Sequence, residues 1–306
     1  MNEKSNLIFL LGAGRSGTTL LYKILSAHRN VAYLSNYQQR YPEWPFLACL
    51  QRLPNYFPGL KRKSWFKESG GAYFNERRRL WLHSIVPTPS EAESVYASCG
   101  IPLAPAEDYY LLPHTADCLR ERFERILHAS GADVLLSKRT ANNRRIPVLK
   151  QIFPNAKYIH LIRDGRAVAH SLLQVKWWND HTLYWAGKTL RQMIAEGADP
   201  IELAAQNWVE EMHSLERGIA LIQSNQLLEV RYDELLRDPC GQLQRILDFM
   251  EATVQADATF WGIVESLHFA PRQEAWVRNW TESELNRVLN LQGDTLHRWG
   301  FLATDE

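Results

Sequence analysis

The sequence contains few cysteines, and none of them lies in a metal-binding pattern. Only four of its 306 residues are cysteine, and no two of them form a Cys-x-x-Cys pair. This spacing argues against zinc sites and predicts reduced thiols at Cys49, Cys99, Cys118 and Cys240. Reduced thiols fit a reducing compartment, so we expect a cytoplasmic location.

Net charge and long apolar runs are also lacking. Lysine and arginine number 35 and aspartate and glutamate 34, a balance that argues against a general nucleic-acid or membrane-surface binder. The apolar run at 7–11 is far too short to cross a bilayer, and it leads into a glycine turn rather than a cleavage site. We therefore expect no nucleic-acid partner, no membrane span, and a small molecule as the partner. The oligomeric state stays open.

Strand-like and helix-like segments alternate along much of the chain. Apolar runs predict strands at 7–11, 31–34, 133–137, 157–162 and 227–230. Three- and four-residue spacing predicts helices at 18–28, 119–129 and 142–152, and from Pro200 and Pro239 onward. This alternation favours an α/β fold with a P-loop-like, doubly wound parallel sheet flanked by helices.

Residues from about 40 to 115 differ from the rest. They carry many aromatic residues and prolines and little clean periodicity. We expect them to form an aromatic-rich cap inserted into a single domain that covers residues 1–306.

The stretch "LLGAGRSGTTLL" places a glycine-rich turn between the first strand and the first helix. Gly12, Gly14 and Gly17 satisfy the Gly-x-Gly-x-x-Gly pattern of dinucleotide folds. That fold also requires an acidic residue after the second strand, where this chain has Ser35 and Asn36. The dinucleotide interpretation therefore lacks the acidic residue that would bind the ribose.

A Walker P-loop is the second interpretation of this turn. Gly12 and Gly17 have the correct spacing, but Thr18 stands where the lysine of that motif should be. Without this lysine the loop lacks much of the charge needed for a triphosphate. A nucleotide or small-molecule kinase remains as an alternative.

The third interpretation keeps the loop and changes the ligand. A helix N-terminus with the hydroxyls of Thr18 and Thr19 suits a single 5′-phosphate, and Arg15 supplies a forked positive charge. Such a loop suits the phosphosulfate of 3′-phosphoadenosine-5′-phosphosulfate (PAPS). A second anion site is then needed for the 3′-phosphate, and "HLIRDGRAVAHSLL" offers Arg163 at a strand end and Ser171 on the following helix.

These two motifs together resemble the PAPS-dependent sulfotransferase family. "GAGRSGTTL" is similar to its 5′-phosphosulfate loop, and "RDGRAVAHSL" to its 3′-phosphate site. The stretch 137–173 is most similar to bacterial sulfotransferases related to the protein-tyrosine sulfotransferases, and "EVRYDELLRDP" also looks like a family element. The resemblance implies PAPS as co-substrate, 3′-phosphoadenosine-5′-phosphate (PAP) as product, a hydroxyl acceptor and no metal. It implies that the nucleotide is bound by Gly14, Arg15, Ser16, Gly17, Thr18, Thr19, Arg163, Ser171 and Tyr232.

The resemblance also implies a catalytic lysine, and the chain departs from the family at the general base. Lys138, after the strand at 133–137, matches the lysine that contacts the sulfuryl or leaving oxygen. Relatives carry a glutamate after the second strand, where Ser35 and Asn36 stand here. The candidates for a base all lie in the cap, and we place Glu93 first among Glu91, Glu93, Glu107, Asp108 and His114.

Two further questions stay open in the sequence. The segment "KWWNDHTLYW" at 176–185 is either an aromatic wall of the acceptor site or ordinary packing. Because the family glutamate is absent, a sulfotransferase-like protein that binds PAPS or PAP without turnover is an alternative to an enzyme. Asn142, Asn143 and Arg144 begin the helix after Lys138. A helix-capping role is the default expectation for them, and the alternative is that they help to orient the acceptor or Lys138.

Overall fold

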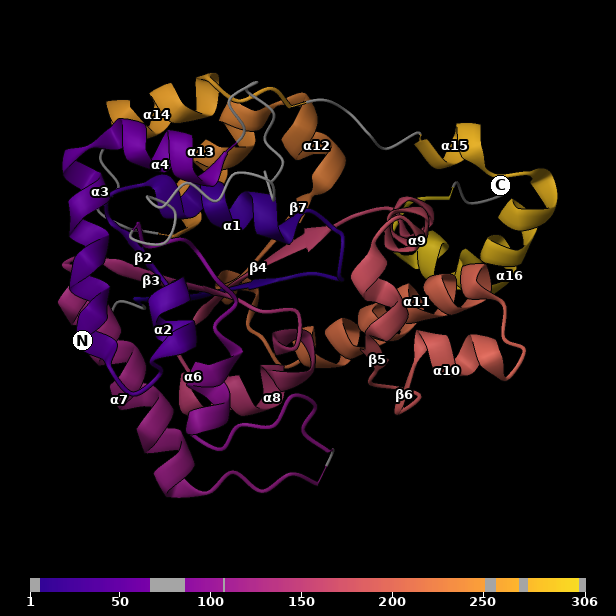
Figure 1. Ribbon diagram of the computed structural model, residues 1–306, viewed down its shortest axis with the longest axis horizontal. Helices are drawn as coiled ribbons and strands as arrows, with labels where there is room; N and C mark the ends of the chain where they lie inside the picture. Colours follow the sequence, from indigo (N-terminus) through magenta and orange to yellow (C-terminus); the bar gives the residue numbers. More distant parts are fainter. Residues whose placement is uncertain (1–5, 67–85, 107, 251–256, 270–274, 303–306) are drawn as a thin grey trace.

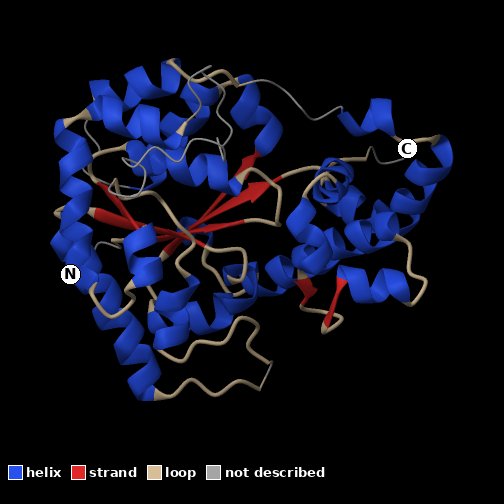
Figure 2. Ribbon diagram, viewed as in Figure 1, coloured by secondary structure: helices blue, strands red, loops and turns tan. Residues whose placement is uncertain are grey.

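The computed structural model describes residues 6–66, 86–106, 108–250, 257–269 and 275–302. A five-stranded sheet lies at the centre, with strand order β2-β3-β1-β4-β7 and every neighbouring pair parallel (Figure 1; Figure 2). Its strands are β1 (Leu7–Leu11), β2 (Val31–Tyr33), β3 (Val134–Lys138), β4 (Lys157–Ile162) and β7 (Leu227–Arg231). The predicted doubly wound parallel sheet is confirmed.

Helices cover both faces of this sheet, because alternate residues of each strand point to opposite sides. Phe9 and Leu11 face a core that also holds α7 (Pro113–Ser130), α8 (Asn142–Ile152) and α11 (Pro200–Ile219). Ile8 and Leu10 face the opposite core, which is built with α1 (Thr18–Ala27), α12 (Tyr232–Arg237), α13 (Pro239–Met250) and α14 (Ala258–Glu265). Both cores are needed to bury strands that are apolar on both faces.

A group of helices lies beyond the carboxyl ends of β4 and β7, at the right of Figure 1. It contains α9 (Gly165–Leu173), α10 (Leu190–Ala195), α15 (Ala275–Asn279) and α16 (Glu282–Arg298). A small hairpin of β5 (Thr182–Leu183) and β6 (Lys188–Thr189) lies beside them, after the 3₁₀ helix η2 (Lys176–Asp180). A further 3₁₀ turn, η3 (Ser224–Gln226), precedes β7.

The predicted cap contains short helices rather than irregular chain alone. In its described part these are the 3₁₀ helix η1 (Pro45–Arg52), α3 (Leu53–Tyr56), α4 (Pro58–Trp65) and α6 (Glu93–Ser98), and α2 (Asn36–Arg40) directly precedes them. The helix expected at 119–129 begins earlier, at Pro113, since proline is well suited to the first helical position. The other predicted elements agree with the structure to within a residue or two at their ends.

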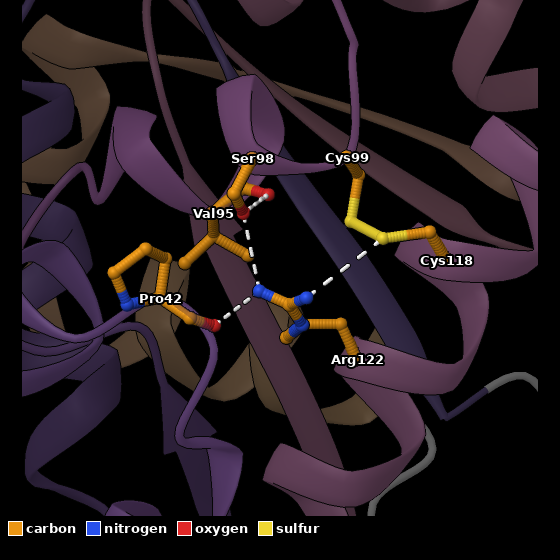
Figure 3. Close-up of a disulfide and its surroundings, with 6 residues drawn as sticks. All are labelled: Pro42, Val95, Ser98, Cys99, Cys118 and Arg122. Atoms are coloured by element: carbon orange, nitrogen blue, oxygen red, sulfur yellow. Dashed lines mark hydrogen bonds between the residues drawn. A yellow bond between two sulfur atoms is a disulfide. The ribbon is translucent and has the colours of Figure 1, made fainter.

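The prediction of four reduced thiols is wrong for two of them. Cys99, after α6, and Cys118, on α7, form a disulfide with a Cα–Cα distance of 5.6 Å (Figure 3). The guanidinium of Arg122 lies beside it and donates to the Ser98 hydroxyl at 3.1 Å. The spacing of the cysteines did not reveal this pair, because it depends on how α6 and α7 pack together, and the two cysteines are 19 positions apart in the sequence. Cys49 and Cys240 are free and exposed.

Among the described residues, none of the helices is both long and apolar enough to cross a bilayer.

Candidate functional site

The glycine-rich turn lies at the carboxyl end of β1, in the middle of the sheet. Gly12 and Gly17 have φ values of 147° and 94°, in the region that favours glycine. A Cβ at Gly12 would also lie 2.6 Å from the Leu161 carbonyl oxygen, so the loop passes directly over β4. Helix α1 begins at Thr18, and its N-cap Gly17 has no side chain to accept from the N–H groups of the first turn, although the Leu20 and Leu21 N–H groups donate to the Gly17 carbonyl. The turn is therefore an N–H-lined cradle of the kind that binds anions.

The loop and the second predicted anion site meet. The Arg15 Nε atom donates to the Ser171 hydroxyl at 3.0 Å, although 156 residues separate them. Arg163, at the end of β4, donates from Nη1 to the Arg15 carbonyl at 2.7 Å. The two motifs are thus in direct contact, although they lie far apart in the sequence.

Tyr232 closes one side of this site. It is buried at the start of α12, and its ring centre lies 4.7 Å from the Arg163 guanidinium. Its edge lies against Gly17, where a Cβ would approach Cε2 to 2.4 Å. The glycine therefore lets the aromatic ring pack directly on the loop.

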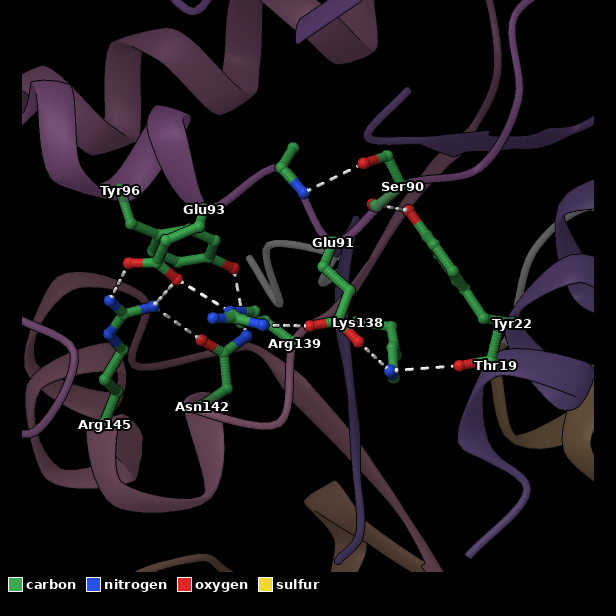
Figure 4. A network of polar contacts seen from close by, with 11 residues as sticks. Thr19, Tyr22, Ser90, Glu91, Glu93, Tyr96, Lys138, Arg139, Asn142 and Arg145 are labelled. Atoms are coloured by element: carbon green, nitrogen blue, oxygen red, sulfur yellow. Dashed lines mark hydrogen bonds and ion pairs between the residues drawn. The ribbon is translucent and has the colours of Figure 1, made fainter. Parts of the chain in front are cut away.

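Lys138 faces the loop from the end of β3. Its side chain is buried, and Nζ donates to the Thr19 hydroxyl at 3.2 Å (Figure 4). The same ammonium forms an ion pair with Glu91. A cation, a hydroxyl of α1 and a carboxylate thus meet at one point beside the predicted 5′ site.

Glu91 and Glu93 have different surroundings. Glu91 bridges Lys138 and Arg139, whereas Glu93 is held by Arg139, at 2.9 Å from Nε, and by Arg145 (Figure 4). Burial alone would raise the pKa of Glu91, but the charges of Lys138 and Arg139 outweigh it and lower that pKa to about 2. The geometry therefore favours Glu91 over Glu93 as the carboxylate nearest the loop. Glu107 lies outside the described residues, and Asp108 and His114 are exposed.

The segment before α6 reaches the site by pairing with the end of β2. Ser90 N–H donates to the Leu34 carbonyl at 2.8 Å, and Asn36 N–H donates to the Thr88 carbonyl at 3.0 Å. The Asn36 side chain accepts from the Thr88 N–H at 2.9 Å. These bonds place Glu91 next to the end of β2, where Ser35 and Asn36 stand. In the sequence, Glu91 was only one of several acidic residues of the predicted cap, and the path of that segment in space could not be predicted.

The capping role expected for the residues after Lys138 is wrong. Helix α8 has Ala141 as its N-cap and no side-chain cap. Asn142 instead donates to the Tyr96 hydroxyl at 3.0 Å, and Arg144 pairs with Glu211 at 2.6 Å. Both side chains are used for packing helices around the site.

The aromatic segment at 176–185 divides between packing and surface. Trp178 is buried in the core, whereas Trp177 and His181 are exposed. Tyr184 lies under the Arg144 guanidinium, 4.0 Å from its ring centre. Burial and the charges of Arg144 and Arg139 lower the pKa of His181, which places this segment near the cations of the site.

Two curated relatives are similar to this chain over most of its length. Omega-hydroxy-beta-dihydromenaquinone-9 sulfotransferase Stf3 of Mycobacterium bovis is 25% identical over 256 residues, or 78% of this chain and 61% of the relative. Protein-tyrosine sulfotransferase of Drosophila melanogaster is 23% identical over 257 residues, or 82% of this chain and 39% of the relative. The chain thus spans less than two thirds of the length of these relatives.

Two solved structures share the fold, and a family model covers most of the chain. Sulfotransferase STF9 from Mycobacterium avium has a TM-score of 0.56 at 15% identity, covering 97% of this chain and 77% of that one. The sulfotransferase domain from the curacin biosynthetic pathway has a TM-score of 0.50 at 15% identity, covering 94% and 98%. The model of the sulfotransferase family matches residues 7–256. The predicted resemblance is confirmed: the chain belongs to the sulfotransferase family.

Proposed function

We propose that this protein transfers the sulfuryl group of PAPS to a hydroxyl acceptor. The observation that carries the proposal is the junction of the two motifs: Arg15 on the loop is hydrogen-bonded to Ser171 on α9. A bisphosphorylated adenosine needs two anion sites within its own length, and this junction supplies them at one edge of the sheet.

The nucleotide is assigned to the loop and to the ends of β4 and β7. Residues 14–19 bind the 5′ side, and Arg163 with Ser171 binds the 3′-phosphate. Tyr232, packed on Gly17 and Arg163, borders the adenine region. PAPS is the co-substrate and PAP the product, and we propose that no metal is needed.

The reaction is an in-line displacement at sulfur. The acceptor oxygen forms a bond to sulfur while the bond between sulfur and the bridging oxygen of the 5′-phosphate breaks, and PAP leaves with that electron pair. Lys138 stabilises the charge that develops on the bridging oxygen, since its ammonium already lies against Thr19 of the loop. The acceptor proton passes to a carboxylate, and we assign this role to Glu91 rather than to Glu93.

Glu91 is a weak base while it is paired with Lys138. An ammonium that turns toward the bridging oxygen leaves that carboxylate with less positive charge nearby, so its pKa rises when PAPS is bound. The ion pair therefore links arrival of the donor to activation of the base.

The acceptor class is set by the cap and the segment 176–185. We propose that residues of about 40–115 form part of the acceptor site within a single domain. The relatives named above take a tyrosine and a hydroxylated menaquinone, so phenols and lipid alcohols belong in the acceptor panel. The cytoplasmic location stays a prediction, and the Cys99–Cys118 disulfide weighs against it, because disulfides persist in oxidising compartments.

Radiolabelled PAPS tests the function directly. The protein is incubated with ³⁵S-PAPS, a chelator and a panel containing a tyrosine peptide, a simple phenol, a sugar and a hydroxylated isoprenoid. We expect PAP release with label on at least one acceptor, and a loss of about 10²–10³-fold in kcat for Lys138→Ala with PAP still bound. Binding of PAP without transfer to any acceptor would favour a non-catalytic protein, and a requirement for ATP and Mg²⁺ would favour a kinase.

A further inference from the structure

Asn143 holds the first residue of the glycine-rich loop at two points. It is fully buried near the start of α8, and its Oδ1 accepts from the Gly12 N–H at 3.1 Å. Its Nδ2 donates to the Gly12 carbonyl at 3.0 Å. Because one side chain contacts both backbone groups of a single residue, it fixes the orientation of the peptide planes where β1 ends and the loop begins.

Glu211 fixes the orientation of this amide. It lies on α11 with 5% of its surface exposed, and its Oε2 accepts from Asn143 Nδ2 at 2.7 Å. Only the NH₂ end of an amide donates, so the carboxylate holds Nδ2 on its own side and leaves Oδ1 for the Gly12 N–H. Both hydrogens of that NH₂ group then have an acceptor, one on Glu211 and one on Gly12.

Arg144 partly offsets the cost of burying the Glu211 carboxylate, although burial still raises the pKa of Glu211. Its Nη1 donates to Glu211 Oε1 at 2.6 Å, and its guanidinium stacks on Tyr184 at 4.0 Å. A buried carboxylate is costly unless it is paired and hydrogen-bonded, and Glu211 has both kinds of partner. The network therefore runs from α11 through α8 to the loop, and both carboxylate oxygens of Glu211 accept a hydrogen bond in it.

We propose that Asn143 and Glu211 are positioning residues for the part of the loop that holds the 5′-phosphate. Neither side chain touches the nucleotide in this account; both act through the Gly12 backbone. The proposal rests on the proposed function, because it assumes that the loop binds the 5′ side of PAPS. Small displacements of groups that hold a reacting phosphate have large effects, so a clamp at the start of the loop has a measurable consequence.

The test compares two ligands that differ only in the 5′-phosphate. The affinities of PAP and of adenosine 3′-phosphate are measured by calorimetry for the wild type, Asn143→Ala, Glu211→Gln and Ser214→Ala. We expect Asn143→Ala to bind PAP about tenfold more weakly, with a smaller loss for Glu211→Gln, which keeps one acceptor for Asn143. Adenosine 3′-phosphate should lose less affinity than PAP in Asn143→Ala and Glu211→Gln, because Asn143 contacts Gly12 and neither Arg163 nor Ser171.

Ser214→Ala is the matched control. Ser214 lies on α11, the same helix as Glu211, and its hydroxyl is 2.9 Å from the Tyr184 hydroxyl. The substitution removes this hydrogen bond but no partner of Asn143. We expect its PAP affinity to equal that of the wild type. If Asn143→Ala fails to fold, the PAP affinity of Glu211→Gln tests the proposal, since glutamine has the same shape as the glutamate that it replaces.

The outcomes separate this inference from the proposed function. A wild type that does not bind PAP contradicts the proposed function itself. A wild type that binds PAP, with Glu211→Gln and any folded Asn143→Ala binding it equally well, overturns the positioning role. Equal losses for PAP and adenosine 3′-phosphate also overturn it, because they show a general structural effect rather than one on the 5′ loop.

Discussion

Glu91 and Lys138 form an ion pair although 47 residues separate them in the chain. The lysine comes from the end of a central strand, and the glutamate comes from the cap. Their contact connects the cap to the glycine-rich loop, because Lys138 also donates to Thr19. The pairing of residues 88–90 with the end of β2 thus brings a carboxylate to a place where the second strand itself ends without one.

Substitution of the two carboxylates should affect different properties: catalysis for Glu91 and stability for Glu93. We expect Glu91→Gln to lower kcat by about 10²–10⁴-fold if Glu91 takes the acceptor proton. Glu93→Gln should instead lower stability by about 2–4 kcal/mol, because it weakens the pairing of the fully buried Arg145. Single-turnover transfer and thermal unfolding of both variants check this pair. If Glu93→Gln lowers kcat strongly and Glu91→Gln does not, Glu93 rather than Glu91 is the general base.

The low pKa of Glu91 also has a consequence for acid stability. Its pKa falls from 4.5 to about 2 on folding, so its ionised form is favoured in the native state. The resulting stabilisation is present above pH 4.5 and is lost as the pH falls through about 2. The melting temperature of the wild type should therefore fall more steeply than that of Glu91→Gln between these pH values. Parallel curves would show that the ion pair is absent in solution.

Ser171 should distinguish ligands by their 3′-phosphate. Its hydroxyl already binds Arg15, so Ser171→Ala removes one polar group from the predicted 3′ site without removing a buried core residue. We expect about fivefold weaker binding of PAP and unchanged binding of adenosine 5′-phosphate, measured by calorimetry. Equal weakening of both ligands would mean that Ser171 acts on the loop and not on the 3′-phosphate.

Two glycines of the loop offer a matched test of its packing. Gly17→Ala places a Cβ at positive φ and 2.4 Å from the Tyr232 ring, and we expect a loss of about 2–4 kcal/mol of stability. A Cβ at Gly14 meets no atom within 4 Å, so Gly14→Ala should leave the free energy of unfolding unchanged. Denaturant unfolding measures both. Equal stability of the two variants would contradict the contact between Tyr232 and the loop.

The sequence predicted the sheet well, since its strands are short apolar runs bounded by clear turns. The strand Leu7–Leu11 and the helix Asn142–Ile152 have the bounds that their patterns indicated. Local periodicity carries this information because each element buries its own apolar residues.

Contacts between distant segments were not predictable in the same way. Glu91 reaches Lys138 only because residues 88–90 pair with the end of β2, and nothing in the local sequence records that pairing. Asparagine is a common helix-capping residue, yet the side chain of Asn143 is buried and hydrogen-bonded to Gly12 and Glu211. The Cys99–Cys118 pair depends in the same way on how the cap folds against α7.

The disulfide should contribute to stability through the loop that it closes. Because its cysteines are 19 positions apart in the sequence, its removal should cost about 3 kcal/mol of unfolding free energy. The double variant Cys99→Ser with Cys118→Ser, compared with the wild type with and without a dithiol, measures this loss by denaturant unfolding. A wild type whose stability is unaffected by the dithiol, and equal to that of the double variant, would show that the bond is not formed in the isolated protein.

The most direct test of the central claim is the melting temperature in the presence of PAP, adenosine 5′-phosphate and Mg²⁺-ATP. A ligand that binds only the native protein raises the melting temperature, by about 3–6 °C at a concentration near 100 times its Kd. The account predicts a larger rise with PAP than with either of the other nucleotides at equal concentration, because PAP alone fills both the loop and the site at Arg163 and Ser171. A larger rise with Mg²⁺-ATP, or no rise with PAP, would contradict it.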